Sequence, residues 1–289
     1  MINLHCAASA AFLRATIAVA ALTAASLGTP DRASAAQCGA PETPCELDQG
    51  VYFAALPNTP DPPPAVIWLH GYGRSGEAMI QNAGYVDPFL RRGYAVIMPS
   101  GQPGHGGKAL DWGVMDGTDH ARDDVAFIQA VRADAIDRFG LDPARILLAG
   151  FSRGGSMVWD MACRAPGVAR AYAAVAGAFW EPMATDCTRP VDLFHSHGMA
   201  DRLVPFEGRE IVFADTPFIQ GSVMKGIQIW RRENGCTGSA ENSFGADGSM
   251  QKDWDDCASG AIRLRLTTDG HRVPEGWRAD VLDWFETHP

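Results

Sequence analysis

A Gly-x-Ser-x-Gly pentapeptide is the feature that most constrains what this chain can fold into. The apolar run Ile146-Leu147-Leu148-Ala149 leads into Gly150-Phe151-Ser152-Arg153-Gly154, and residues 156–161 are compatible with a helix. Between a strand and a helix, this pentapeptide forms a nucleophile elbow, a turn so tight that its serine takes a strained backbone conformation. The strain would hold the Ser152 hydroxyl at a helix N-terminus, where backbone N–H groups favour developing negative charge. The pentapeptide alone also fits an ordinary glycine-rich turn.

Short apolar runs alternate with helix-compatible segments along the rest of the chain. The expected strands cover residues 51–56, 65–69, 94–98, 146–149, 173–177, 190–195 and 261–266. The expected helices cover residues 123–139, 156–161, 218–234 and 277–287. This alternation predicts an α/β fold with a mostly parallel sheet and helices on both faces. No repeat, linker or change of composition divides the chain, so residues 36–289 are expected to form a single domain.

A serine hydroxyl becomes a good nucleophile only beside a base that an acid orients. In α/β-hydrolases the chain order is serine, acid, histidine, and working residues lie at the carboxyl ends of strands. Asp201 follows the strand that ends at His195, and His271 lies in the loop after the last expected strand. The sequence therefore predicts an α/β-hydrolase fold with Ser152 as nucleophile, Asp201 as acid and His271 as base.

Acyl transfer also needs backbone donors for the oxyanion of the tetrahedral intermediate. The residue after the nucleophile, Arg153, is expected to supply one N–H. The glycine turn His70-Gly71-Tyr72-Gly73 follows the strand 65–69, and its glycines would let the backbone turn inward. The amide of Tyr72 is therefore the expected second donor.

The His195-Ser196-His197 run is a competing candidate, because two histidines can bind a metal. No acidic cluster with ligand spacing accompanies the run, so structural packing is the favoured interpretation and no metal is predicted. No cofactor is expected either, since water performs the deacylation of an acyl-enzyme.

The N-terminus has the pattern of an export signal. Arg14 precedes an apolar run over residues 15–22, and Ala33-Ser34-Ala35 offers a small-x-small cleavage site. The apolar run is too short to span a bilayer. Residues 1–35 are therefore predicted to be a cleaved signal peptide, which implies a secreted or periplasmic protein without a membrane anchor.

Cysteine usage agrees with export. Removal of Cys6 with the signal leaves six cysteines, an even set that is expected to pair in an oxidising compartment. Six cysteines allow 15 connectivities. Pairing of sequence neighbours is the simplest hypothesis, and it would join Cys38 to Cys45, Cys163 to Cys187 and Cys236 to Cys257.

Charge and aromatic residues bear on the partner. The formal net charge of −10 argues against nucleic acid, because phosphate binding needs a basic surface. A small-molecule or oligomeric ester is the expected partner. Trp112, Phe151 and Trp180 lie in or near loops expected at the carboxyl edge of the sheet, so they are predicted to line a substrate pocket. Packing within the loops is an equally good interpretation of Trp112 and Trp180.

With these residues in hand, the mature chain resembles the secreted polyhydroxybutyrate depolymerase-like and feruloyl esterase-like α/β-hydrolases related to carbohydrate-esterase family 1. The resemblance rests on the motifs around Tyr72 and Ser152, on His197-Gly198-Met199-Ala200-Asp201, on Asn234-Gly235-Cys236 and on His271. It implies the same triad and supports the pair Cys236–Cys257. Where the family usually has tryptophan after the histidine, this chain has Arg272, which is expected to alter the substrate pocket.

The combined pattern predicts a secreted serine ester hydrolase that works through an acyl-enzyme. Feruloyl or aryl esters and hydroxyalkanoate esters are the two substrate classes that the resemblance implies. Two alternatives use the same scaffold: a non-catalytic binding protein, and an acyltransferase that transfers the acyl group to an alcohol other than water.

Overall fold

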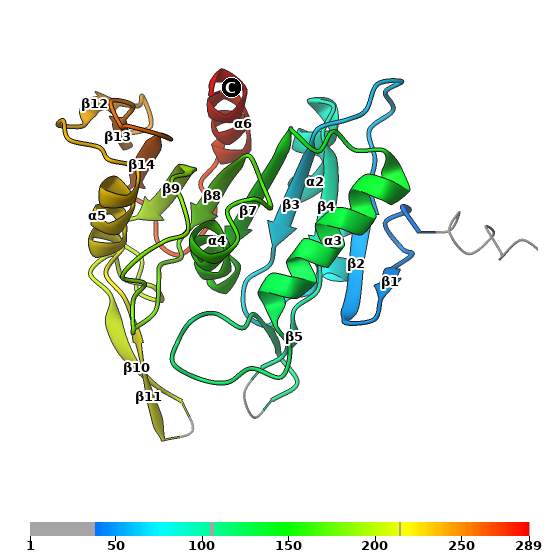
Figure 1. The fold of residues 1–289 in the computed structure, drawn as a ribbon, viewed down its shortest axis with the longest axis horizontal. Helices are drawn as coiled ribbons and strands as arrows, with labels where there is room; N and C mark the ends of the chain where they lie inside the picture. Colours follow the sequence, from blue (N-terminus) through cyan, green and yellow to red (C-terminus); the bar gives the residue numbers. More distant parts are fainter. Residues whose placement is uncertain (1–37, 105–106, 214, 289) are drawn as a thin grey trace, which may run out of the picture. The chain divides into compact units, whose positions relative to one another are not determined.

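The structure of this chain is a computed structural model that describes residues 38–104, 107–213 and 215–288. The predicted signal peptide lies outside the described residues. The strands are β1 Cys45–Leu47, β2 Gly50–Ala55, β3 Ala65–Leu69, β4 Ala95–Pro99, β5 Gln102–Pro103, β6 Leu110–Asp111, β7 Ile146–Phe151, β8 Ala171–Val175, β9 Asp192–Gly198, β10 Arg209–Phe213, β11 Thr216–Gln220, β12 Glu241–Phe244, β13 Met250–Trp254 and β14 Ile262–Thr267. The helices are α1 Gly76–Ile80, α2 Ala83–Arg91, α3 Asp124–Phe139, α4 Arg153–Arg164, α5 Val223–Glu233 and α6 Trp277–Thr287 (Figure 1).

One large sheet organises these elements. It has ten strands in the order β1-β2-β4-β3-β7-β8-β9-β14-β13-β12. The central strands from β4 to β14 are parallel, whereas β1 and β2 on one side and β13 and β12 on the other pair antiparallel. The predicted mostly parallel sheet is confirmed. Its parallel strands end at one edge, so the loops after β3, β7, β9 and β14 meet there.

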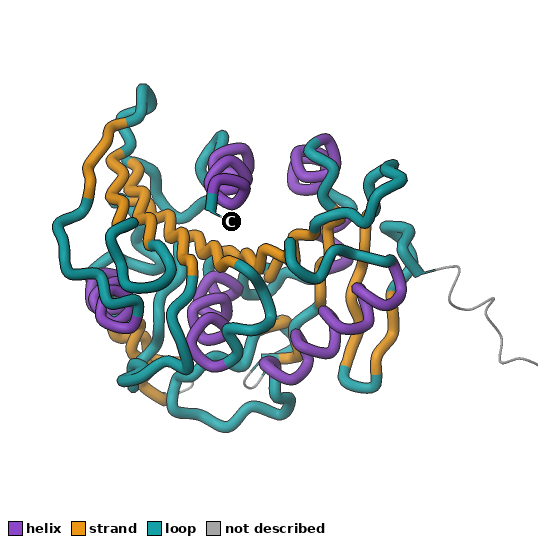
Figure 2. The backbone as a smooth tube through the Cα atoms, turned by 45° about the horizontal axis from the view of Figure 1, so that its top comes forward, coloured by secondary structure: helices purple, strands orange, loops and turns teal. Residues whose placement is uncertain are grey.

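Alternate residues of the central strands enter two separate cores. In β3, Ile67 packs into a core that includes residues of α3, α4 and α5, while Trp68 packs into a core with residues of α2 and α6. Figure 2 shows helices on both sides of the sheet. Helix α6 closes the second core through Trp277, whose ring centroid lies 5.5 Å from that of Trp68. Burial on both faces explains why these strands are continuous apolar runs.

The helix predicted over residues 218–234 is wrong at its start. Helix α5 begins only at Val223, because the Ser222 side chain accepts a hydrogen bond from the Lys225 amide and caps the helix there. Residues 216–220 instead form β11, which pairs antiparallel with β10 in a hairpin of its own. The hairpin was missed because its partner strand has no distinctive apolar pattern.

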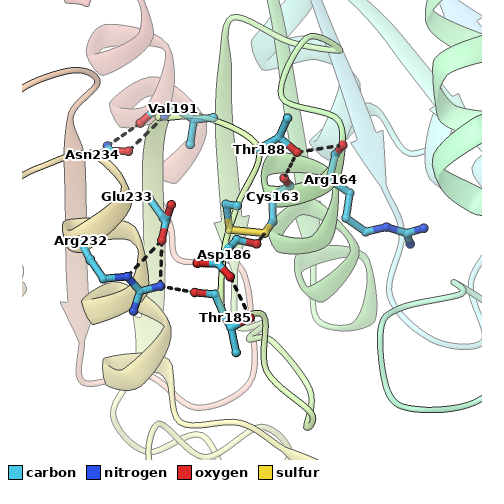
Figure 3. The surroundings of a disulfide bond; sticks show 10 residues. Cys163, Arg164, Thr185, Asp186, Thr188, Val191, Arg232, Glu233 and Asn234 are labelled. Carbon is cyan, nitrogen blue, oxygen red and sulfur yellow. Dashed lines mark hydrogen bonds and ion pairs between the residues drawn. A yellow bond between two sulfur atoms is a disulfide. The ribbon is translucent and has the colours of Figure 1, made fainter.

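The structure contains three disulfides, and they join the cysteine pairs expected from the sequence. Figure 3 shows that Cys163 of α4 is joined to the loop before β9, where the Thr188 hydroxyl donates to the Cys163 carbonyl at 2.9 Å. Three disulfides are typical of extracellular or periplasmic proteins. In the part of the chain that the structure describes, no helix has the length and apolarity needed to cross a bilayer.

Candidate active site

Ser152 lies in a strained turn between β7 and α4. Its φ of 58° is in the left-handed region, which a non-glycine residue adopts only where the surroundings impose it. The turn has no room for a side chain at Gly154, since a Cβ there would lie 2.2 Å from the Leu69 carbonyl oxygen. The Ser152 amide donates to the Val175 carbonyl of the neighbouring β8 at 2.8 Å, which ties the turn to the sheet. The predicted strand–turn–helix context is thus present.

The structure brings the three predicted triad residues together. His271 Nε2 lies 2.8 Å from Ser152 Oγ, and His271 Nδ1 lies 2.7 Å from Asp201 Oδ2. These residues come from the loops after β7, β9 and β14, and they are separated by up to 119 positions in the chain. The spacing is that of a nucleophile, a base and an orienting acid.

Asp201 is held as a carboxylate. Its second oxygen, Oδ1, accepts hydrogen bonds from the amides of Leu203 and Val204 at 2.8 and 2.9 Å. Burial opposes ionisation, but the hydrogen bonds from His271 and from these two amides hold the pKa of Asp201 below its usual range. Asp201 is therefore charged at neutral pH, and it accepts a hydrogen bond from the N–H of His271 Nδ1.

Phe151 contacts the base rather than the cavity. Its ring centroid lies 4.8 Å from that of His271, with the two rings tilted by 41°. Phe151 is not among the residues that line the cavity over Ser152. The prediction that Phe151 lines the pocket is therefore corrected: the side chain of a strand's last residue points away from the following serine and packs beside His271.

The two expected oxyanion donors, the amides of Arg153 and Tyr72, belong to segments next to Ser152. Arg153 is the first residue of α4, so its N–H belongs to the helix N-terminal amides that have no partner within the helix. The Tyr72 loop approaches so closely that a Cβ on Gly71 would lie 3.4 Å from Ser152 Cβ. The Gly73 amide donates to the Leu110 carbonyl at 2.8 Å, which fixes the turn around Tyr72.

His70 and Trp112 hold the Tyr72 loop in place through buried hydrogen bonds. The Gly101 amide donates to His70 Nε2 at 2.9 Å, so His70 carries its proton on Nδ1, which lies 2.8 Å from the Gly71 carbonyl oxygen. Burial lowers the pKa of His70 to about 4, which keeps the ring neutral. Trp112 is fully buried, and its indole N–H donates to the His70 carbonyl at 2.8 Å. Of the two interpretations of Trp112, loop packing is the one that the structure bears out and pocket lining is wrong, because the buried indole is hydrogen-bonded to the Tyr72 loop.

A cavity of about 360 Å³ opens above Ser152 and His271. Trp180 lies in its wall, as the sequence predicted for a pocket residue, and its indole N–H donates to Ser156 Oγ at 3.2 Å. The other lining residues come mainly from the loop 111–120, the loop after Asp201 and the β10–β11 hairpin; they are Tyr72, Asp111, Asp116, Thr118, His120, Arg153, Ser156, Leu203, Val204, Arg209, Ile211, Phe218 and Gln220. Sequence reasoning missed most of these, because they are distant in the chain and belong to no motif.

Arg153 anchors one side of the cavity. Its guanidinium pairs with Asp111 at 2.8 Å and with Asp116 at 2.9 Å, and it lies 4.6 Å from the Trp180 ring centroid. Burial opposes ionisation of Asp116, but hydrogen bonds from His120, Thr118 and Arg153 hold its pKa well below the usual range. Arg153, whose amide is an expected oxyanion donor, is thus also fastened through its side chain.

Arg272 does not reach the cavity. Its side chain is 63% exposed and pairs with Asp269 Oδ1 at 2.9 Å, three residues earlier in the same loop. The expectation that Arg272 alters the pocket is therefore corrected, because the nearby carboxylate draws the guanidinium outward. Among the residues that the structure describes, no three His, Cys, Asp or Glu side chains are grouped as a metal site would require.

Comparisons with known proteins agree with the fold. The sequence profile described as "Alpha/beta hydrolase family" matches residues 66–285. NocK from Nocardia uniformis subsp. tsuyamanensis, described as a candidate esterase, is 32% identical over 168 residues, which are 56% of this chain and 47% of NocK. Feruloyl esterase C from Emericella nidulans is 28% identical over 125 residues, which are 42% of this chain and 44% of that protein. The chain thus spans about half the length of these curated relatives.

A solved carboxylesterase from Mesorhizobium loti has a similar fold. Its TM-score is 0.56 at 14% sequence identity, and the match covers 86% of this chain and all of that one (100%). At this identity the likeness concerns the fold alone. The overall fold of this chain is therefore shared with that of the solved carboxylesterase.

Proposed function

This chain belongs to the alpha/beta hydrolase family, and we propose that it is a serine carboxylic-ester hydrolase whose nucleophile is Ser152. The observation that carries the proposal is the continuous hydrogen-bonded line from Ser152 Oγ through His271 to Asp201, at the floor of a cavity. Similarity to proteins described as esterases supports the same reaction class.

The geometry accounts for both halves of an acyl-transfer cycle. His271 Nε2 takes the proton of Ser152 as Oγ attacks the ester carbonyl carbon, and it returns this proton to the leaving alcohol. Asp201 holds the ring in the tautomer with hydrogen on Nδ1 and stabilises the imidazolium. Water then attacks the acyl carbon and loses a proton to His271, which returns this proton to Ser152 Oγ as the bond to Oγ breaks and the acid leaves.

The oxyanion that forms in each half would face two backbone amides, those of Arg153 and Tyr72. Each such donor contributes a factor of about 10²–10³ to the rate in other enzymes. The positive end of the α4 dipole would add to the stabilisation of the oxyanion by the Arg153 amide. Because the ion pairs of Arg153 and the buried contacts of His70 fix both amides before substrate arrives, little reorganisation accompanies the reaction.

The cavity wall favours an apolar or aryl acyl group. Trp180, Ile211 and Phe218 offer apolar surface, while Arg153 and its carboxylate partners form a polar side. Feruloyl or aryl esters and hydroxyalkanoate esters both fit a cavity of about 360 Å³. The polyhydroxybutyrate depolymerase-like or feruloyl esterase-like type, with a soluble ester as partner, is part of this proposal.

We also propose that residues 36–289 act as a single exported catalytic domain, secreted or periplasmic after removal of residues 1–35. The three disulfides support export. N-terminal sequencing of the protein recovered outside the cytoplasm tests the cleavage site: a new N-terminus close to residue 36 is expected, and an intact Met1 contradicts the proposal.

The decisive test of the reaction is hydrolysis of p-nitrophenyl acetate by the wild type and by Ser152→Ala. Turnover by the wild type and only background hydrolysis by the variant are expected. Equal rates would favour a non-catalytic binding protein. Parallel assays with methyl ferulate and with hydroxybutyrate oligomers separate the two substrate classes, and addition of an alcohol reveals whether the acyl group is transferred instead of hydrolysed.

A further inference from the structure

Two buried histidines on β9 lie outside the proposed triad. His195 and His197 are both fully buried and point to the same face of the strand, with ring centroids 5.3 Å apart. His195 Nε2 and His197 Nδ1 are 3.0 Å apart, which is a hydrogen-bond distance. Two neutral imidazoles in a core need partners for every ring nitrogen, because an unpaired polar group there costs about 1–3 kcal/mol.

The partners of these rings define where each proton lies. The Trp159 indole N–H can only donate, and its acceptor is His195 Nδ1 at 3.2 Å. His195 therefore carries its proton on Nε2 and donates it to His197 Nδ1. His197 then carries its proton on Nε2, which donates to the Val204 carbonyl oxygen at 2.8 Å. Burial lowers the pKa of both histidines, which agrees with two neutral rings.

This hydrogen-bonded line ends at the turn that holds the proposed acid. Val204, whose carbonyl accepts from His197, donates its own N–H to Asp201 Oδ1 at 2.9 Å. His197 Nε2 lies 3.8 Å from the other carboxylate oxygen, Oδ2, which is the oxygen that faces His271. The line thus runs from α4 through β9 and fastens the Asp201 turn to the sheet.

We propose that His195 and His197 are positioning residues, which with Trp159 fix the Asp201 turn so that Oδ2 faces His271 Nδ1. The proposal rests on the proposed function of the Ser152 site. A neutral His197 can hold the turn without competing for the carboxylate, whereas a protonated His197 would attract Oδ2 away from His271. The charged or titratable groups around His197 are His195, Asp201, Glu207 and His271.

Removal of the line should affect catalysis more than binding. In His197→Phe the ring volume stays, but the donor to the Val204 carbonyl is lost. A small displacement of Asp201 is expected to lower kcat for p-nitrophenyl acetate by about 10–100-fold with an unchanged KM. The acid limb of the pH–rate profile should move to lower pH, because a displaced Asp201 stabilises the His271 imidazolium less.

A conservative variant and a matched control separate positioning from stability. His197→Gln places an amide N–H near the position of Nε2, so kcat should remain within about threefold of the wild type. Asn234→Ala is the control, because Asn234 accepts from the Val191 amide at 3.1 Å and donates to its carbonyl at 2.7 Å at the other end of β9 (Figure 3). This control should unfold more easily than the wild type, yet keep its kcat and pH profile.

The proton positions can be measured independently of activity. In ¹⁵N NMR spectra of the histidine-labelled wild type, both His195 and His197 should appear as neutral rings with hydrogen on Nε2 between pH 6 and 8. Any other tautomer would overturn the proposed line, whether or not the protein hydrolyses esters, and this test remains if His197→Phe fails to fold.

The outcomes also separate this proposal from the function on which it rests. Absence of Ser152-dependent hydrolysis in the wild type contradicts the esterase function. Hydrolysis by the wild type together with an unchanged kcat and pH profile in His197→Phe contradicts positioning alone. If kcat falls in His197→Gln and in Asn234→Ala as much as in His197→Phe, the effect is general destabilisation, and that result also contradicts the proposal.

Discussion

The two walls of the cavity differ in how they are built. One wall consists of loops at the carboxyl edge of the central strands, and it carries Ser152, Asp201 and His271. The other wall consists of the loop 111–120 and the β10–β11 hairpin, which hold no member of the triad. In the proposed function, the first wall carries the reacting groups, while the second wall selects the substrate through its shape and polarity. Mutations in the two walls should therefore change different kinetic constants.

The largest effect is expected on the triad wall from Asp201→Asn. The amide cannot replace the carboxylate that stabilises the imidazolium, and its NH₂ group would favour the wrong tautomer of His271. A fall in kcat of about 10³–10⁴-fold with an unchanged KM is expected for p-nitrophenyl acetate. Asp269→Asn is the control in the neighbouring loop, since Asp269 pairs with the exposed Arg272. If kcat falls as much in Asp269→Asn as in Asp201→Asn, the loss of activity comes from the charge of the loop and not from the hydrogen bond to His271.

Arg153→Met tests the connection between the two walls. The change keeps the backbone N–H of residue 153 but leaves Asp111 and Asp116 without their shared cation, and the Asp116 side chain is only 3% exposed. A buried charge that loses its partner destabilises a protein by about 3–5 kcal/mol. Urea unfolding should show a loss of this order, and kcat/KM should fall as the loop 111–120 loosens. Arg272→Met serves as control, and stability equal to that of Arg153→Met would contradict the anchoring role.

Phe218→Ala changes the far wall without touching the triad. Removal of the ring takes apolar surface from the substrate, so KM for an aryl ester should rise by about tenfold. The kcat for p-nitrophenyl acetate should stay close to that of the wild type. Val212→Ala is the matched control on the exposed face of the same hairpin, where the side chain is 63% exposed. If both variants raise KM equally, the hairpin does not line the substrate site.

The last expected effect is on stability rather than on kinetics; it concerns the support of the loop 111–120 and depends on pH. Asp160 of α4 accepts a hydrogen bond from the Met115 amide at 2.6 Å, and complete burial raises the pKa of Asp160 to about 7. Between about pH 4 and 7 the unfolded chain releases this proton while the folded protein keeps it, so the free energy of unfolding falls as the pH rises. Below this range the contribution is fully present, and above it the loss is complete.

Asp160→Asn keeps an acceptor for the Met115 amide but cannot ionise. Its unfolding free energy relative to the wild type should therefore increase by about 3–4 kcal/mol between pH 4 and 7, and then level off. Urea unfolding at several pH values measures this difference. A difference that is independent of pH would mean that Asp160 is not a buried, protonated carboxyl group.

The difference between the two walls also explains which parts of the site the sequence could predict. The elbow at Ser152 and the loops of Asp201 and His271 follow strands whose apolar runs are visible in the chain, so their meeting point is set by the parallel sheet. Trp112 could not be placed, because its burial depends on the His70 carbonyl, 42 residues away. The position of Arg272 could not be predicted, because its ion pair with Asp269 holds the side chain outside the cavity. The start of α5 could not be predicted either, because residues 216–220 pair with β10. Long-range packing determines the second wall, and no local pattern encodes it.

The reactivity of Ser152 can be measured without knowledge of the natural substrate. Incubation with diethyl p-nitrophenyl phosphate should release one equivalent of p-nitrophenol and attach one diethylphosphoryl group, which tandem mass spectrometry should locate on Ser152. His271→Ala should react far more slowly because the base is missing, and Ser152→Ala should not react. Labelling of the wild type at another residue, or no faster than that of Ser152→Ala, would contradict the assignment of Ser152 as an activated nucleophile.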